Sequence, residues 1–246
     1  MDVTIVGYWG AYPAANSATS CYLIQEGETR ILLDCGSGAV SHLQKHIDLN
    51  KLDAVFISHQ HADHTADLGV LAYSRLIGMQ LNYTHHPIEI FVHENAMEWA
   101  KMYQKDPYTE MKTYSEKVSL TYGNLKLEFC KGKHKVDSYA MKVTSTVTGG
   151  TLVYTADTSY SKDIETFAAE SDLLLAECSF YEGQNGELFG HMTSKDCGIL
   201  ARNSGTRKMI LTHLPHFGKQ PELIAEAKKE FTGDIILAKD NDQFQL

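Results

Sequence analysis

The chain has 246 residues, of which 43% are apolar and 22% charged, values that are typical of a globular protein and argue against disorder. A net charge of −9 argues against a protein that wraps long nucleic acid, because binding to phosphates depends on Lys and Arg. Five cysteines without framework spacing fit reduced thiols. We expect no signal peptide and no membrane-spanning run, and therefore a cytoplasmic protein with no membrane contact.

The first part of the chain predicts three strands, at residues 3–6, 21–24 and 30–33. The third strand ends at Asp34, in the stretch Leu32-Leu33-Asp34-Cys35-Gly36. Aspartate at a strand end often does no more than cap a turn, so this position alone assigns no function.

The residues 58–65, Ser-His-Gln-His-Ala-Asp-His-Thr, place three imidazoles and a carboxylate within six positions. The apolar run 54–57 before them predicts a buried strand, and apolar residues at helical spacing follow them. Several side chains of such a strand-to-helix loop can converge on one point. His59 and His61 can hold one ion, while Asp63 and His64 turn toward a second position, and both donor types suit zinc.

From Tyr73 to Glu116 the pattern is less regular, apart from a strand at 88–92 and an amphipathic helix at 94–104. The tract is rich in Tyr and Met, which are found more often in core packing than in substrate binding. It is also a candidate for a lid or a subunit contact, and its function stays open. We interpret His42 and His46 most simply as solvent-facing residues. The remaining three, His85, His86 and His93, complete no ligand spacing and are interpreted as structural or surface residues.

The second part predicts strands at 125–130, 139–145, 152–155, 172–178 and 209–212, and a helix at 194–203 with a capping box at Thr193 and Asp196. A last helix, opened by Pro221 and closed by Gly233, precedes a strand at 235–238. The lysines of the loop 131–135 either raise the local potential for an anion or form a solvated face. Glu177 either orients a catalytic group or is only a strand-end charge.

The motif His59-X-His61-X-Asp63-His64 resembles the signature of the metallo-β-lactamase superfamily, most closely the ribonuclease Z and cyclic phosphodiesterase branch. The resemblance covers nearly the whole chain. It implies an α/β fold, a four-layer αββα sandwich, with residues 1–246 as a single domain. It also implies that Asp34 fixes the metal loop and its imidazoles.

The resemblance further implies a centre of two zinc ions, with manganese or iron as alternatives. His59, His61 and His134 would hold one ion and Asp63, His64 and His213 the other, with Asp157 as the bridge. Asp63 and His191 are the candidate catalytic residues. His191 occupies the place of an extra histidine in this branch. It either donates a proton to the leaving oxygen or binds the developing charge on phosphate, or it is structural.

These features predict a metal-dependent hydrolase, a phosphodiesterase for a small or cyclic phosphodiester. The connection from His134 to Asp157 is too short for the tRNA-grasping arm of ribonuclease Z, which together with the acidic charge argues against tRNA as a partner. A carboxylic ester, lactone or thioester hydrolase is the alternative, and a non-catalytic metal-binding protein is a weaker one. A homodimer stays open.

Overall fold

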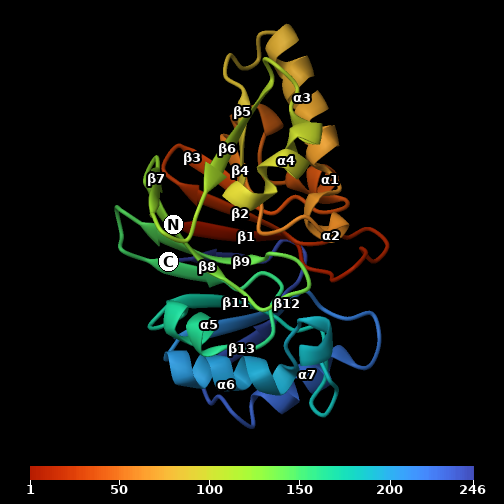
Figure 1. Ribbon diagram of the computed structural model, residues 1–246, viewed down its shortest axis with the longest axis vertical. Coiled ribbons are helices and arrows are strands. Elements are labelled where there is room, and N and C mark those ends of the chain that lie inside the picture. The colour runs from red at the N-terminus through yellow and green to blue at the C-terminus, as the bar shows by residue number, and fades with distance from the viewer. The chain divides into compact units, whose positions relative to one another are not determined.

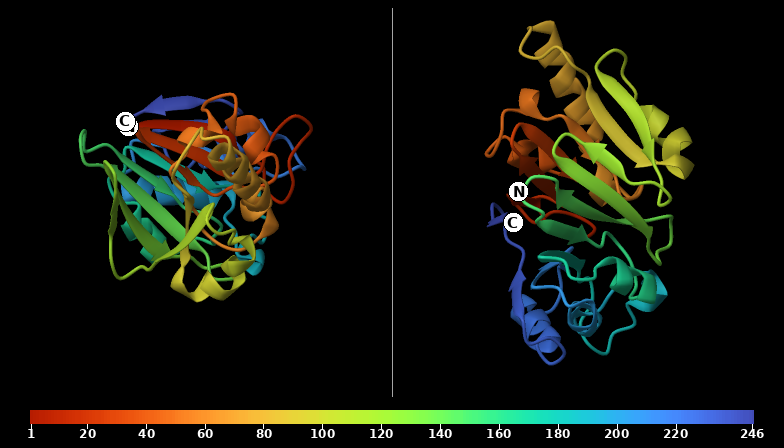
Figure 2. Two further views of the ribbon diagram at one scale, coloured as in Figure 1. Left: turned by 90° about the horizontal axis from the view of Figure 1, so that it is seen from above. Right: turned by 90° about the vertical axis from the view of Figure 1, so that its left-hand side faces the viewer.

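The computed structural model describes all residues from Met1 to Leu246, which form two compact units. The first unit contains Met1–Ser115 and Asp240–Gln245, and the second contains Glu116–Lys239 and Leu246. Each unit has one seven-stranded sheet (Figures 1 and 2). The prediction of a single domain stays a prediction.

The sheet of the first unit has the strand order β14-β1-β2-β3-β4-β5-β6. Its strands are β1 (Asp2–Gly7), β2 (Cys21–Glu26), β3 (Thr29–Leu33), β4 (Ala54–Phe56), β5 (Ile88–His93), β6 (Thr109–Tyr114) and β14 (Gln243–Gln245). Neighbours pair antiparallel from β14 to β3 and parallel from β3 to β6. The carboxyl ends of β3 and β4 therefore lie side by side, which brings Asp34 next to the metal loop.

The helical segments of the first unit are α1 (Ala39–Leu43), α2 (Ala62–Thr65), α3 (Leu68–Gln80), α4 (Met97–Ala100), and the 3₁₀ turns η1 (Leu49–Lys51), η2 (Glu94–Ala96) and η3 (Lys101–Tyr103). Leu43, Leu68 and Ala100 from three of these helices join one apolar core with the buried side chains of the strands. None of the helices in the structure has both the length and the apolarity that a membrane-spanning segment requires.

The sheet of the second unit has the strand order β13-β12-β11-β10-β9-β8-β7. Its strands are β7 (Leu120–Tyr122), β8 (Leu125–Lys131), β9 (Tyr139–Ser145), β10 (Thr151–Tyr154), β11 (Leu173–Glu177), β12 (Lys208–Thr212) and β13 (Asp234–Leu237). The pairs from β7 to β10 are antiparallel and those from β10 to β13 are parallel. The parallel strands β10, β11 and β12 thus end at one edge, just before Asp157, at Glu177 and just before His213.

The second unit has the helices α5 (Lys162–Phe167), α6 (Ser194–Ser204) and α7 (Gln220–Ala227) and the 3₁₀ turn η4 (Glu187–Phe189). The capping box of α6 is confirmed: Thr193 accepts from the Asp196 N–H while the Asp196 carboxylate accepts from the Thr193 N–H. Helix α7 ends at Ala227, before the glycine that was expected to close it.

Two sequence predictions in the first unit were wrong. The segment 94–104 is not one helix but three short helical pieces, because packing overrides the weak helical preference of its sequence. His42 is not a surface residue, since α1 packs against β1 and leaves that side chain buried. His93 is the structural residue that the sequence allowed: it is buried, and its ring accepts from the Asn95 N–H to begin η2.

All five cysteines are free thiols. Four of them are buried, two in each unit: Cys21 and Cys35 in the first, Cys178 and Cys197 in the second. Burial raises the pKa of the Cys21, Cys35 and Cys197 thiols well above the ordinary value.

Candidate metal centre

The metal loop of the first unit leaves β4 and enters the short helix α2, so that its donors lie on one tight turn. The Nε2 atom of His59 lies 3.1 Å from Nδ1 of His61. The Nε2 atom of His64 lies 3.7 Å from Oδ2 of Asp63. The loop therefore presents two adjacent donor pairs, one of two imidazoles and one of an imidazole with a carboxylate.

Asp34 fixes this loop from the end of β3. Its Oδ1 atom accepts from the Ser58 N–H at 2.7 Å, and its Oδ2 atom accepts from the Ser58 hydroxyl at 2.8 Å. The same Oδ2 atom lies 2.7 Å from Nδ1 of His64, and both side chains are fully buried. A proton on Nδ1 of His64 satisfies this contact and leaves Nε2 as the lone-pair donor, which is the usual arrangement around ligating histidines.

Local backbone geometry makes room for these contacts. Asp34 has a φ of 60°, a left-handed conformation that aspartate adopts more readily than most residues. Gly36 lies so close to the turn that a Cβ atom there would be 2.1 Å from the Asp63 carbonyl oxygen. Glycine is thus required at position 36, because any side chain would displace the turn that carries the carboxylate.

The second unit brings His134, Asp157 and His213 together. Nε2 of His134 lies 3.8 Å from Oδ2 of Asp157, and Nε2 of His213 lies 3.4 Å from Oδ1 of Asp157. One carboxylate therefore faces two imidazoles through its two different oxygens. This is the arrangement in which a carboxylate can touch two ions, whereas each imidazole can offer one lone pair to one ion.

Burial shapes the electrostatics of His134. Its side chain is 1% exposed, and this burial is the main cause that lowers the pKa of the imidazole below its ordinary value of 6.5. Its Nδ1 atom lies 2.8 Å from the Gly190 carbonyl oxygen, which holds the proton on that nitrogen. The ring is therefore neutral at pH 7 with Nε2 turned toward Asp157, the form that binds a metal ion.

A second cluster in the same unit joins Glu177, His191 and His213, whose ligand atoms lie within 4.8 Å of one another. Glu177 is fully buried at the end of β11, and its Oε1 atom lies 2.9 Å from Nδ1 of His191. The same oxygen accepts from the N–H groups of Thr158 and Met192. The sequence left two readings of Glu177 open, and this geometry favours the one in which it orients a neighbouring group.

Ser179 is a residue of this cluster that the sequence did not single out. Its hydroxyl donates to Oε2 of Glu177 at 2.9 Å and lies 2.8 Å from Nδ1 of His213. Its backbone N–H donates to the same carboxylate oxygen. The available signal was its place two residues after a strand-end glutamate, which is too common in sequences to be specific.

The donors in both units fit a transition-metal ion of the zinc type. They are imidazoles and carboxylates, without the thiolates that would favour softer metals or the oxygen-only sets that favour Mg²⁺ and Ca²⁺. The ligand nitrogens of His64 and His134 are oriented by a second hydrogen bond at the other ring nitrogen, as expected for metal ligands.

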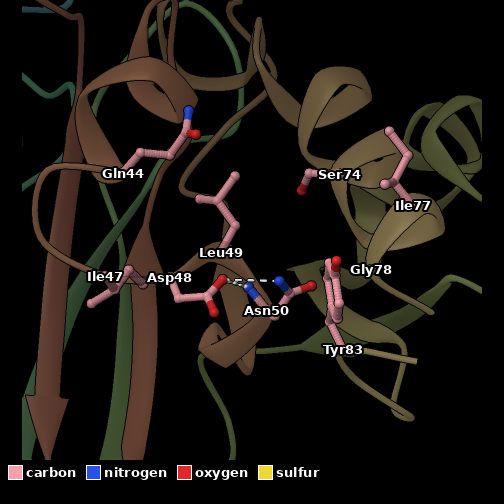
Figure 3. Close-up of a pocket in the computed structure, with 9 residues that line it drawn as sticks. All are labelled: Gln44, Ile47, Asp48, Leu49, Asn50, Ser74, Ile77, Gly78 and Tyr83. Atoms are coloured by element: carbon pink, nitrogen blue, oxygen red, sulfur yellow. Dashed lines mark hydrogen bonds between the residues drawn. The ribbon is translucent and has the colours of Figure 1, made fainter. Parts of the chain in front are cut away.

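The first unit also has a larger pocket, which is lined by none of these donors; Figure 3 shows its lining. Its volume is about 360 Å³, and its lining residues are Gln44, Ile47, Asp48, Leu49, Asn50, Ser74, Ile77, Gly78 and Tyr83. Its one carboxylate, Asp48, accepts from the N–H and the side-chain amide of Asn50 and so caps η1. None of the candidate site residues lines this pocket.

Known proteins are similar to this chain over the region that contains the candidate residues. A family model described as "Beta-lactamase superfamily domain" matches residues 29–214, a range that includes all the candidate residues. The chain is 41% identical over 239 residues to "Probable metallo-hydrolase YhfI" of Bacillus subtilis (strain 168), with 97% of each covered.

Two solved structures extend the comparison. The crystal structure of the metallo-beta-lactamase fold protein YhfI from Bacillus subtilis matches with a TM-score of 0.96 and 39% identity, covering 99% of this chain and 98% of that one. The human tRNase Z, short form, matches with a TM-score of 0.78 and 21% identity, covering 100% and 99%. At that identity the second likeness concerns the fold alone.

Proposed function

The chain belongs to the metallo-β-lactamase superfamily and is a metallo-hydrolase, and from this premise we propose that it is a binuclear phosphodiesterase for a small or cyclic phosphodiester. The family and the α/β fold predicted from the sequence are confirmed. The substrate class, the number of ions and the ligand roles are the proposal.

In this proposal His59, His61 and His134 hold one ion, Asp63, His64 and His213 hold the other, and Asp157 bridges them. Two zinc ions so held would supply an activated water and a clamp for the oxygens of the reacting group. The two oxygens of Asp157 face different histidines, at 3.8 and 3.4 Å, which supports the bridging role. Asp34 and the Gly190 carbonyl keep Nε2 of His64 and of His134 available as donors.

The hydrogen-bonded pair Glu177–His191 is the observation that carries the proposal of phosphodiester cleavage. It lies beside His213, with the rings of His191 and His213 stacked at a centroid distance of 5.5 Å, and it is spare once seven ligands are assigned. A phosphodiester with an alkoxide leaving group needs a proton donor at the leaving oxygen. The Glu177 carboxylate holds Nδ1 of His191 and thereby leaves Nε2 of that ring to deliver a proton or to bind the developing charge.

Asp63 is the second candidate catalytic residue. Its Oδ2 atom accepts from the Ala11 N–H at 2.8 Å, which holds the carboxylate in the metal loop. As a proposed metal ligand, Asp63 can also orient the attacking water by accepting a hydrogen bond from it.

Metal analysis tests the first half of the proposal. We expect about two transition-metal ions per chain, most simply zinc. The metal content of Asp157→Ala should fall by more than one ion per chain, whereas that of His59→Ala should fall by close to one ion per chain. In the proposed centre the aspartate contacts both ions and the histidine only one. A wild-type protein that is active without metal would refute the proposed centre.

Leaving-group dependence tests the role of His191. His191→Ala should keep its metal content and lose about 10²–10⁴ in the turnover of a diester with an alkoxide leaving group. It should lose far less with a diester that expels nitrophenolate, because that group departs without protonation. Equal losses on both substrates would show that His191 does not transfer the proton. Strong turnover of a lactone or thioester by the wild type, without turnover of any phosphodiester, would refute the proposed substrate class.

A further inference from the structure

A small pocket of the second unit adjoins the candidate centre. Its volume is about 230 Å³, and its lining residues are Lys133, His134, Lys135, Ser159, Glu187 and Gly190. We propose that this pocket binds a second anionic group of the substrate, a terminal phosphate, in addition to the phosphodiester that reacts. The inference rests on the proposed function, because it takes His134 as the point at which the pocket meets the reactive centre.

Two unpaired ammonium groups give the pocket its charge. Lys133 and Lys135 are exposed, and neither forms an ion pair in the structure. Lys131, two residues earlier at the end of β8, is paired with Asp137 at 2.6 Å. The chain has 31 acidic residues against 22 basic ones, so carboxylate partners are plentiful. The two lysines of the pocket thus remain available to an anion from outside the chain.

Their position makes an anion the natural occupant. Glu187 is the single carboxylate of the lining, so two ammonium groups leave the pocket cationic. His134 between them is a proposed ligand of a metal cation, and like charges repel at such separations. An anion bound in the pocket would offset this repulsion. The sequence left a solvated face as the other interpretation of these lysines, and a solvated face requires no pocket between them.

The backbone around the pocket is held by hydrogen bonds. The Lys133 N–H donates to the Thr158 hydroxyl at 2.9 Å, and the Lys133 carbonyl accepts from the Ser159 N–H at 2.9 Å. On the opposite side, the Gly190 carbonyl lies 2.8 Å from Nδ1 of His134. A Cβ atom at Gly190 would lie 2.9 Å from that nitrogen, so the wall is in close contact with the histidine. The lining is therefore organised before a ligand arrives.

The size of the pocket limits its ligand. Sites for drug-sized molecules occupy roughly 300–1,000 Å³. A pocket of about 230 Å³ is smaller, and it suits a single charged group better than a complete nucleoside. Ammonium groups attract a phosphate dianion more strongly than a monoanion. The substrate class that follows is a phosphodiester with a terminal phosphate monoester nearby, as in a phosphorylated dinucleotide.

A matched pair of substrates tests this inference on the metal-loaded enzyme. The 4-nitrophenyl ester of thymidine 5′-phosphate and its 3′-phosphorylated form differ by one phosphate and release the same nitrophenolate. The wild type should show a KM about 10-fold lower for the 3′-phosphorylated ester, given the modest contribution of each exposed ammonium. The double variant Lys133→Ala/Lys135→Ala should abolish this preference with little change in kcat. Lys131→Ala, which removes the ion-paired lysine at the end of β8, should keep this preference.

Calorimetry of ligand binding separates the failure of the pocket from the failure of the proposed function. Thymidine 3′,5′-bisphosphate should bind the wild type about 10-fold more tightly than thymidine 5′-monophosphate, and the double variant should bind both equally. If neither ester is hydrolysed but this difference holds, the phosphodiesterase proposal fails and the pocket stands. If the plain ester is hydrolysed and the 3′-phosphate changes neither KM nor affinity, the pocket is refuted.

Discussion

Asp34→Asn is the substitution that most directly tests how the metal loop is held. The aspartate accepts three hydrogen bonds, from the Ser58 N–H and hydroxyl and from Nδ1 of His64. Asparagine has the same shape and tolerates the φ of 60° at this position, so the backbone need not change. What changes is the charge and one acceptor, because the amide group offers one oxygen and one NH₂ in place of two oxygens.

The expected cost follows from these contacts. Whichever way the amide turns, at least one of the three donors faces NH₂, and the remaining bonds lose their ionic partner. Hydrogen bonds to charged groups contribute about 1.5–3 kcal/mol each. The loss of one to two of them lowers the free energy of unfolding by roughly 1.5–6 kcal/mol. The His64 ring also loses its anchor, so metal affinity should fall about 10–100-fold.

Urea unfolding of chelator-treated protein measures the first effect, and competition with a chromophoric chelator measures the second. Asp48→Asn is the matched control, because Asp48 caps η1 at the surface and asparagine caps a helix equally well. That control should change the free energy of unfolding by less than about 0.5 kcal/mol. A change under about 1 kcal/mol for Asp34→Asn, with unaltered metal affinity, would refute the reasoning.

Two further predictions concern stability. Hydrogen bonds, the largest from Lys162 and then from Tyr160 and Asn203, lower the pKa of Glu165 to about 2. The folded chain therefore releases this proton at lower pH than the unfolded chain, so the stabilisation is complete above about pH 4.5 and lost as the pH falls toward 2. Glu165→Gln should lower the melting temperature of metal-free protein at pH 7 by about 2 °C, since the ion pair is partly solvent-screened. Comparison at pH 3.5 should show a smaller difference, and a constant difference would contradict the assignment. Arg75 is buried in α3 and donates to the carbonyls of Leu52 and His86. Arg75→Met should lower the free energy of unfolding in urea by about 3 kcal/mol, because buried acceptors lose their partner, and a loss below 1 kcal/mol would refute that role.

The sequence predicted the metal loop because its signal is local. A buried strand, a dense set of donors and an amphipathic helix follow one another within residues 54–80, and the structure has β4, α2 and α3 in that order. The strand ends before Asp157 and His213 were predicted for the same reason, since each follows an apolar run in a parallel sheet.

The contacts between distant residues could not be predicted. Glu177 contacts His191, which lies fourteen positions later in the sequence. The hydrophobic pattern of a sequence does not indicate which hydrogen bond a buried carboxylate makes. The segment 94–104 failed for a related reason: helical propensity is a weak preference that packing overrides. The absence of ion pairs at the pocket lysines was equally hidden, because ion pairing depends on which side chains the fold brings together.

The buried cysteines are distributed so that their reactivity can report local opening of each unit. Each unit has two thiols that solvent does not reach, and a folded chain can react with an alkylating agent there only after local opening. Cys130 is only half-buried, but burial raises the pKa of its thiol to about 11, so its background reaction at neutral pH is slow. Pulse labelling followed by mass spectrometry can therefore time local opening in each of the two units separately, without any introduced probe.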